Sequence, residues 1–324
     1  IGYQTMDAMQ VGQDNIAIGR ASMGNANHED ADSNIVIGVY AGDAFGTNAV
    51  AGTVLIGREA GSEINHTDAS NTVAVGRLAL AALTTGAGNV AIGYEAGMAL
   101  TSTSWNTFIG HESGEANTGS GNVGVGYHSL ADSSSDVDNC VAIGYNALAT
   151  ADSAYDDGST AVGYKALQDQ NATALSGNTA LGFEAGKGII SGAGNTAVGY
   201  QAGLALTNED NNTILGYQAG LAASGAGSTY IGQHSGKGAS GADTDNVAVG
   251  KDSMFAISDG TSNVAIGKAS GNTTTTGDYN TTVGKSSNVS AVDAQNQTAI
   301  GYNATGVADN SVTLGNTSVV GIYH

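Results

Sequence analysis

Carboxylate side chains in the polar stretches between short apolar segments are the residues of this sequence that could hold a cation. They lie close together along the chain at Asp136, Asp138, Asp156, Asp157, Glu209, Asp210, Asp243 and Asp245. Ca²⁺ takes carboxylate and backbone carbonyl oxygens as ligands. No segment, however, has the spacing of an EF-hand loop or of a nonapeptide calcium repeat. We therefore expect solvated acidic loops, and we predict neither a metal site nor a cofactor.

Catalytic groupings are equally sparse. Residues 119–124 match the pattern G-x-G-x-x-G, but no buried strand is expected before them and no helix after them, so nucleotide binding is not predicted. The 6 His residues are scattered, and His128 and His234 occupy one position of a repeat, which favours a fixed surface role. Glycoside cleavage needs two carboxyl groups about 5–9 Å apart in a groove, and no acidic pair differs from the loop background. The sequence thus predicts a protein that is not an enzyme.

The loops between the apolar segments offer the best candidates for binding a receptor. Trp105 is the only tryptophan, and it lies in a loop where the repeat described below requires no aromatic residue. An exposed loop tryptophan is suited to contact a glycan or a protein, although packing against the neighbouring loop is an equally good interpretation. The candidate receptor contacts are Trp105, Tyr155, Asp156, Asp157, Glu209 and Asp210.

A short repeat must position all of these residues, and its clearest copy is Asn-Val-Ala-Ile-Gly-Tyr-Glu-Ala at residues 89–96. The residue before its glycine is Ile, Val or Leu in every copy, the third residue after it is Ala or Ser in all but one, and eleven of eighteen complete copies have Asn four residues before it. An array this regular predicts stacked repeats rather than a globular core. The nineteen glycines, here called anchor glycines, are Gly2, Gly19, Gly38, Gly57, Gly76, Gly93, Gly110, Gly126, Gly144, Gly163, Gly182, Gly199, Gly216, Gly232, Gly250, Gly267, Gly284, Gly301 and Gly315.

The spacing of the anchor glycines contains a second level of order. Successive anchors are 14 to 19 residues apart, and the six steps from Gly38 to Gly144 recur from Gly144 to Gly250. We interpret residues 38–143 and 144–249 as a duplicated block of 106 residues. Since no linker interrupts the repeats, residues 1–324 are predicted to form one continuous array that ends in a tight coil at 302–324. Ile1 lies inside a repeat unit, so we expect the chain to be a fragment of a longer fibre.

Each repeat is predicted to form one coil of a parallel β-roll. Segments such as residues 90–92, Val-Ala-Ile, are short and β-branched, which favours a strand. The anchor glycine permits a bend or a close backbone contact, and the Asn tolerates left-handed backbone and can stack its amide on the Asn of the next coil. Both faces of the strand are apolar. One face is expected inside the coil, and the other needs a second surface, which the association of several chains would supply.

Aromatic residues follow many anchor glycines directly, and we expect them to stack along a corner of the coil rather than to bind sugars. They are Tyr94, Tyr127, Tyr145, Tyr164, Phe183, Tyr200, Tyr217 and Tyr302.

Composition narrows the class of protein further. The chain has 50 Gly, no Pro and only 12% charged residues, which suits turns and flat strands better than helices. Its formal net charge of −20 argues against a nucleic-acid partner. No run of about 18 apolar residues occurs, so no segment is predicted to insert into a membrane. The single Cys140 excludes an intrachain disulfide, and we expect it to be an inert small side chain.

The pattern resembles the YadA-like head repeat of trimeric autotransporter adhesins, which reads roughly Asn-Ser-Val-Ala-Ile-Gly with Ala or Ser downstream. Residues 310–315, Asn-Ser-Val-Thr-Leu-Gly, are close to it, whereas most other coils have longer loops. Residues 195–203, Asn-Thr-Ala-Val-Gly-Tyr-Gln-Ala-Gly, are also similar to repeats of phage tail fibres. The resemblance implies an all-β, left-handed parallel β-roll of about 18 coils, a homotrimer, and a place on a virion or in the extracellular space.

The repeat and this resemblance together lead us to expect a non-enzymatic, trimeric fibre segment of the tail-fibre or adhesin kind. Its variable loops would present binding surface to a cell-surface glycan or protein receptor. Three alternatives stay open: a bacterial trimeric autotransporter adhesin head, a tailspike-like polysaccharide depolymerase, and a spacer whose binding tip lies elsewhere.

Overall fold

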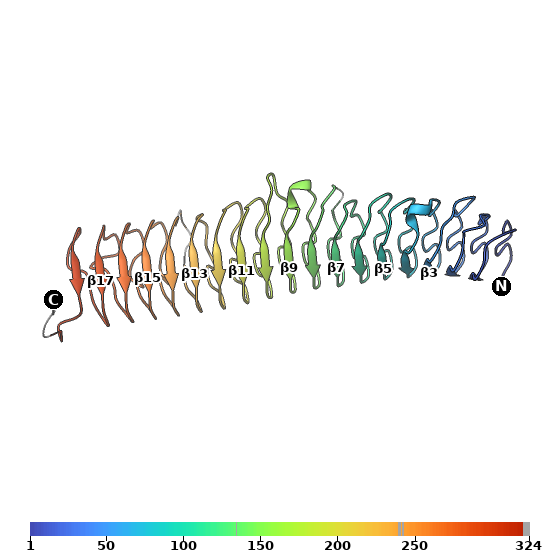
Figure 1. Cartoon of the computed structure of the whole chain (residues 1–324). Helices are drawn as coiled ribbons and strands as arrows, with labels where there is room; N and C mark the ends of the chain where they lie inside the picture. The colour runs from blue at the N-terminus through green and yellow to red at the C-terminus, as the bar shows by residue number, and fades with distance from the viewer. Residues whose placement is uncertain (134, 239–240, 242, 320–324) are drawn as a thin grey trace. The chain divides into compact units, whose positions relative to one another are not determined.

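The computed structural model describes residues 1–133, 135–238, 241 and 243–319. The chain divides into two compact units, unit 1 (Ile1–Val162 with Asn171–Leu175) and unit 2 (Gly163–Gln170 with Ser176–His324). In each unit, one short strand per coil pairs with the strand of the next coil, and the strands follow one another in a row (Figure 1). The all-β parallel solenoid that the repeat predicts is therefore confirmed.

The described residues of unit 1 form nine strands of three residues, each parallel to the next and in register with it. Two 3-10 turns, η1 (Thr67–Ala69) and η2 (Ala154–Asp156), lie in its loops. The strands are β1 (Ile16–Ile18), β2 (Ile35–Ile37), β3 (Val54–Ile56), β4 (Val73–Val75), β5 (Val90–Ile92), β6 (Thr107–Ile109), β7 (Val123–Val125), β8 (Val141–Ile143) and β9 (Thr160–Val162).

Unit 2 has the same construction. The tight coil expected at 302–324 is seen as far as residue 319, with a 14-residue step from Thr298 to its partner Val312; the last five residues lie outside the described part of the chain. The strands are β10 (Thr179–Leu181), β11 (Thr196–Val198), β12 (Thr213–Leu215), β13 (Thr229–Ile231), β14 (Val247–Val249), β15 (Val264–Ile266), β16 (Thr281–Val283), β17 (Thr298–Ile300) and β18 (Val312–Leu314). None of the described residues belongs to a helix with the length and hydropathy needed to cross a membrane.

The middle residue of each strand faces the inside of the coil. It is Ala in most coils, as at Ala91, Ala197 and Ala265, and these side chains are buried, whereas the first and last strand residues are partly or fully exposed. A coil only 14 to 19 residues long encloses a narrow space, so the small side chain must be the inward one. The sequence had left open which face lies inside.

Large inward side chains are accommodated by glycines around them. Phe108 is the middle residue of β6, and its strand partner in β7 is Gly124. A Cβ on Gly114 or Gly124 would lie 2.6 or 2.8 Å from the Phe108 ring. Tyr230 in β13 lies equally close to Gly236. The volume inside successive coils is thus held nearly constant by pairing one large residue with residues that have no side chain.

The anchor glycines form a column in which successive backbones touch. Gly93 has φ of +146°, and a Cβ there would lie 2.1 Å from the carbonyl oxygen of Gly110 in the next coil. Both the conformation and the contact require glycine. The small residue three positions later, such as Ala96 or Ser113, is fully buried, which confirms the close approach expected after the bend.

The buried Asn residues form a ladder, as the repeat suggested. Asn89 Oδ1 accepts hydrogen bonds from the backbone N–H of Asn106 (3.0 Å) and from its Nδ2 (3.2 Å), and Asn106 Nδ2 also donates to the Gly119 carbonyl (2.9 Å). The expectation that this Asn adopts left-handed backbone is wrong. The positive φ falls one residue earlier, at positions such as Asn71 and Asn139.

Cys140 continues the ladder through its backbone, whose N–H donates to Asn122 Oδ1 at 2.9 Å. Its side chain is buried, and burial raises the pKa of the thiol to about 12. The thiol therefore stays protonated at neutral pH, which agrees with the inert role expected for it.

A buried carboxyl group in unit 2 makes stability depend on pH. Asp243 accepts a hydrogen bond from the Tyr230 hydroxyl, and burial raises the pKa of Asp243 from 3.8 to about 6. A carboxyl group with a raised pKa binds its proton more tightly in the folded chain. Its contribution is fully present below pH 3.8 and is lost as the pH rises through about 6.

We expect the free energy of unfolding of the parent to fall by about 2–3 kcal/mol more between pH 4 and pH 7 than that of Asp243→Asn, which cannot ionise. Urea unfolding at several pH values measures both. Repulsion among the remaining carboxylates is common to the two proteins, so it cancels in the comparison. Equal pH slopes would show that Asp243 does not titrate in this range.

Candidate functional site

The outer face of the sheet in each unit carries apolar side chains that nothing in the single chain covers. The last residues of the strands are the clearest case, and we call them the outer stripe. Exposed surface of this kind, running from coil to coil, marks a contact with another molecule. The members with the largest exposure are Ile18 (40%), Ile92 (39%), Ile109 (38%) and Ile143 (39%) in unit 1, and Leu181 (49%), Leu215 (45%), Ile266 (42%), Ile300 (41%) and Leu314 (47%) in unit 2.

Two aromatic ladders lie beside the outer stripe, because their residues follow the anchor glycines directly. In unit 2, Tyr164, Phe183, Tyr200 and Tyr217 stack with ring centroids 4.9–5.2 Å apart and planes within 8–11°. In unit 1 the ladder consists of Tyr94, His111, Tyr127 and Tyr145. The stacking confirms the interpretation of these residues as a packed corner, in which each ring covers the face of the next.

Several of the loop acids bind backbone groups, which the sequence did not suggest, although Asp136, Asp210 and Asp245 are exposed as expected. Asp138 accepts a hydrogen bond from the Ser120 N–H (2.6 Å) and Asp157 from the Asp138 N–H (2.7 Å). Asp210 accepts one from the Ala193 N–H (2.7 Å). Each of these acids lies six residues before an anchor glycine and binds the backbone of the preceding coil. The sequence carries a signal for this bond, because Asp or Ser recurs six residues before many anchor glycines.

The carboxylates of two candidate receptor contacts are already bonded within the chain: Asp156 to the loop of the next coil and Glu209 within its own loop. Asp156 is fully buried, and its Oδ1 accepts a hydrogen bond from the Ala172 N–H at 2.9 Å, so its side chain cannot reach a receptor. Glu209 is half-buried and accepts hydrogen bonds from the N–H groups of Thr207 and Asn208 at 2.6 and 3.1 Å. The Glu209 carboxylate therefore stabilises the turn in which Glu209 itself lies.

Trp105 and Tyr155 remain exposed. Tyr155 lies in η2 and is 51% exposed, and Trp105 is 70% exposed. One side of the Trp105 ring lies on the backbone of Gly88 in the preceding coil, where an added Cβ would be 2.6 Å from Trp105 Cζ3. The ring therefore packs on the neighbouring loop and is still largely exposed, and its contact with a receptor stays a prediction.

The backbone of Trp105 is unusual for a bulky residue. Its φ is +64°, at a repeat position that Asn fills elsewhere, as at Asn71 (φ +60°) and Asn139 (φ +58°). Left-handed backbone costs a non-glycine residue about 1–3 kcal/mol. Tyr279 at the same repeat position has φ of +59°, so the left-handed backbone belongs to this position of the coil, and it is the exposure of Trp105 that makes it a candidate for binding.

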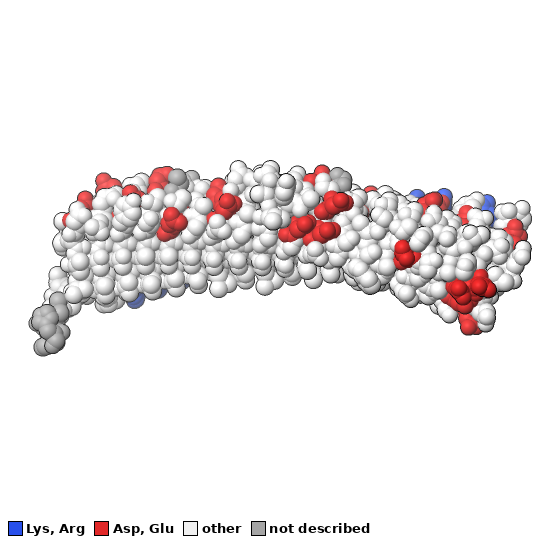
Figure 2. Space-filling view, turned by 45° about the horizontal axis from the view of Figure 1, so that its top comes forward, with Lys and Arg blue, Asp and Glu red and all other residues white. Residues whose placement is uncertain are grey.

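Acidic side chains gather over the loops. In the part of Figure 2 that shows unit 2 they lie along one edge, and the rows of side chains below them are almost all uncharged. Of the 9 Lys and Arg residues, five lie over aromatic rings, among them Arg77 over Tyr94 and Lys165 over Tyr164.

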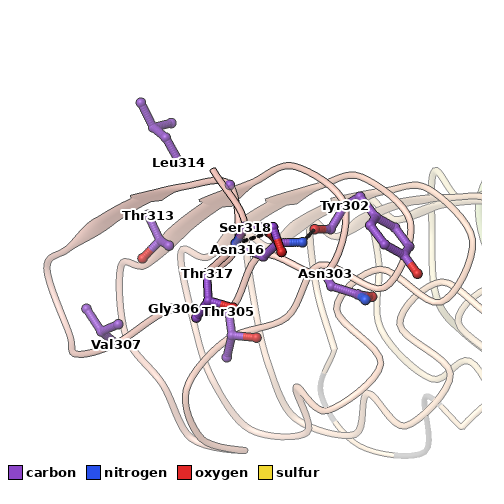
Figure 3. A pocket seen from close by; sticks show the side chains of 11 residues that line it. Tyr302, Asn303, Thr305, Gly306, Val307, Thr313, Leu314, Asn316, Thr317 and Ser318 are labelled. Carbon is purple, nitrogen blue, oxygen red and sulfur yellow. Dashed lines mark hydrogen bonds between the residues drawn. The ribbon is translucent and has the colours of Figure 1, made fainter. Parts of the chain in front are cut away.

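Two recesses could hold a small ligand. The larger, of about 780 Å³, lies at the coil of β18, and its lining side chains, including Tyr302, Asn303 and Asn316, carry no carboxylate (Figure 3). A smaller one of about 360 Å³ in unit 1 contains Asp43, Glu59 and Glu63. Burial and the nearby Glu63 raise the pKa of the Asp43 carboxyl group.

No protein-family model matches this chain, and no curated protein sequence matches it.

Proposed function

We propose that the chain is a segment of a non-enzymatic, trimeric extracellular fibre of the phage tail-fibre or adhesin kind, which projects and presents binding surface. The outer stripe is the observation that carries this proposal. A solenoid coil cannot cover both faces of its strands, and the stripe continues from coil to coil within each unit. Three copies packed through this face would bury it about a common axis, and the loops would remain outside.

The resemblance to YadA-like head repeats and to phage tail-fibre repeats supports the number three and the extracellular or virion location. The net charge of −20 supports a role away from nucleic acid. In a trimer every loop appears three times, so weak contacts with a surface glycan or protein are strengthened by multivalency. A bacterial autotransporter head would be the same kind of trimeric fibre segment, carried on a bacterial surface and not on a phage.

Trp105→Asn tests whether the loops bind. Asn suits the left-handed backbone at this position, so the melting temperature should be unchanged or slightly higher. Binding to intact bacterial cells or to a glycan array should weaken by about tenfold or more if the ring inserts into a receptor. Tyr155→Ser is the second variant to measure. Unchanged binding by both variants, or no binding by the parent, would favour the alternative in which this segment is only a spacer.

Cleavage of surface polysaccharide is the second candidate function, and the recess with Asp43 and Glu63 favours it. A carboxyl group with a raised pKa beside a second carboxylate is the arrangement that glycosidases use. The release of reducing ends from bacterial surface polysaccharide separates the two proposals. The fibre proposal expects no release, whereas release that Asp43→Asn abolishes would establish the depolymerase.

A further inference from the structure

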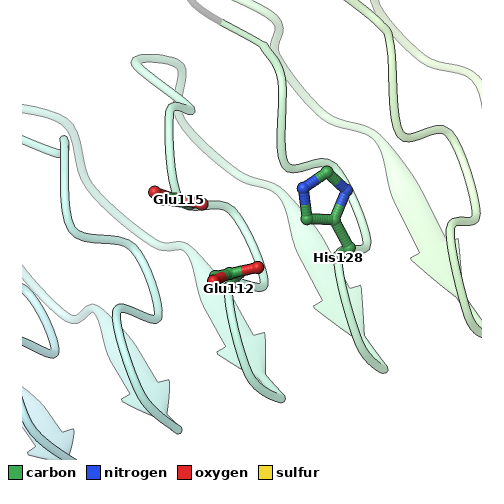
Figure 4. A group of neighbouring side chains, drawn as sticks. All are labelled: Glu112, Glu115 and His128. Carbon is green, nitrogen blue, oxygen red and sulfur yellow. The ribbon is translucent and has the colours of Figure 1, made fainter.

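Two carboxylates and one imidazole converge in unit 1. Glu112 and Glu115 lie in the turn that follows β6, and His128 lies in the corresponding turn of the next coil, after β7 (Figure 4). Each can offer one ligand atom, and the three atoms lie within 4.8 Å of one another. All three residues are half-buried, so the turns restrict their side chains.

The backbone fixes the relative position of the two turns. The His128 N–H donates to the His111 carbonyl at 3.1 Å, and the Glu112 N–H donates to the Tyr94 carbonyl at 2.8 Å. Glu112 and His128 have the same φ of +54° because they occupy the same repeat position, two residues after an anchor glycine. Their side chains therefore leave successive coils in parallel, on the same side of the solenoid.

The two carboxylates of the group formed by Glu112, Glu115 and His128 favour a bound cation. The ligand atoms of Glu112 and Glu115 lie within 4.8 Å of each other, with that of His128 equally near. Two carboxylates this close repel each other when both are charged. A divalent ion between them would convert this repulsion into attraction.

The duplicated block provides an internal comparison. At a distance of 106 residues, His128 corresponds to His234, Glu112 to Gln218, and Glu115 to Leu221. There the carboxylates are absent, and Gln218 is bound by Lys237 (Nζ to Oε1, 3.0 Å). His234 instead lies 3.2 Å from an Asp252 oxygen. The first block thus has two carboxylates where the second block has neutral side chains.

We propose that Glu112, Glu115 and His128 bind a divalent transition-metal ion of the Zn²⁺ kind. An imidazole with two carboxylates is a donor set that Zn²⁺ accepts and that Ca²⁺, which prefers oxygen alone, does not. With metal–ligand distances of about 2.0–2.1 Å, tetrahedral ligand atoms lie about 3.3 Å apart. Rotation of the two Glu side chains closes the remaining distance. The fourth position is left for water.

Isothermal titration of the full chain with ZnCl₂ tests this proposal, using His128→Asn and His234→Asn as a matched pair. Asn is already present at the same repeat position at Asn146, where φ is +52°, so the fold should accept it. We expect one strong site for Zn²⁺ per chain, lost or weakened by about tenfold or more in His128→Asn and in Glu112→Gln, and kept in His234→Asn. Zinc should also raise the melting temperature of the parent but not that of His128→Asn.

Two further measurements, one with CaCl₂ and one on a His111 variant, complete the test. CaCl₂ should give no comparable binding, and His111→Asn should retain the zinc site, although His111 Nδ1 lies 3.5 Å from Glu112 Oε1. Absence of stoichiometric zinc binding by the parent would contradict the proposal. Equal losses in His128→Asn and His234→Asn would also contradict it, since they would indicate adventitious binding by surface histidines.

Discussion

Gly93→Ala should lower the free energy of unfolding by about 2–5 kcal/mol, which is large for the addition of one methyl group. Two costs add. An alanine at φ of +146° is strained, and its Cβ would lie 2.1 Å from the Gly110 carbonyl oxygen, so the two coils must separate. Urea unfolding followed by circular dichroism measures the loss.

Gly158→Ala is the matched control for Gly93→Ala. Gly158 also has a positive φ, +72°, but a Cβ there meets nothing within 4 Å. Gly158→Ala should therefore lower the free energy of unfolding by the backbone strain alone, about 1–2 kcal/mol. If the two variants were equally stable, contact between the anchor glycines would not limit the spacing of the coils.

Replacing Ile92, Ile109 and Ile143 by Asp should abolish assembly while leaving the single chain folded. In one chain these side chains are 38–39% exposed, so the new carboxylates can stay in water. In a trimer packed through the outer stripe they would be buried and unpaired, at a cost of several kcal/mol for each chain. Light scattering should give the mass of one chain, and circular dichroism should still show a β spectrum.

The control for this variant carries the same added charge elsewhere. Val11, Leu175 and Val307 lie in loops and are 47%, 71% and 74% exposed, at least as much as the stripe residues. Their replacement by Asp should leave the oligomer intact. Dissociation of the control as well would mean that net charge, and not the outer stripe, governs association.

Much of the fold could be predicted because each repeat carries the same constraints. The strands of three residues, the glycine contacts, the buried Asn ladder and the stacked aromatic corner are all local or occur at a fixed offset. The sequence could not decide which strand face lies inside, since Ala91 and Ile92 are both apolar. Side-chain volume favours Ala inside a narrow coil, and an inward residue as large as Phe108 needs glycines around it.

The candidate site was less predictable, since it depends on neighbours one coil away. Asp138 and Asp210 look like solvated loop acids in sequence, but each is bonded to the backbone of the preceding coil. Asp243 was also placed in a solvated loop, yet it is buried beside Tyr230. Glu112 and His128 are 16 residues apart, and the stacking of the same repeat position in successive coils brings them together.

The mass of the parent protein in solution tests the proposed trimer most directly. Size-exclusion chromatography with multi-angle light scattering should give one species of three times the 31.9 kDa chain mass. A single species of 31.9 kDa with a β spectrum would contradict the account, because the outer stripe would then be stable in water.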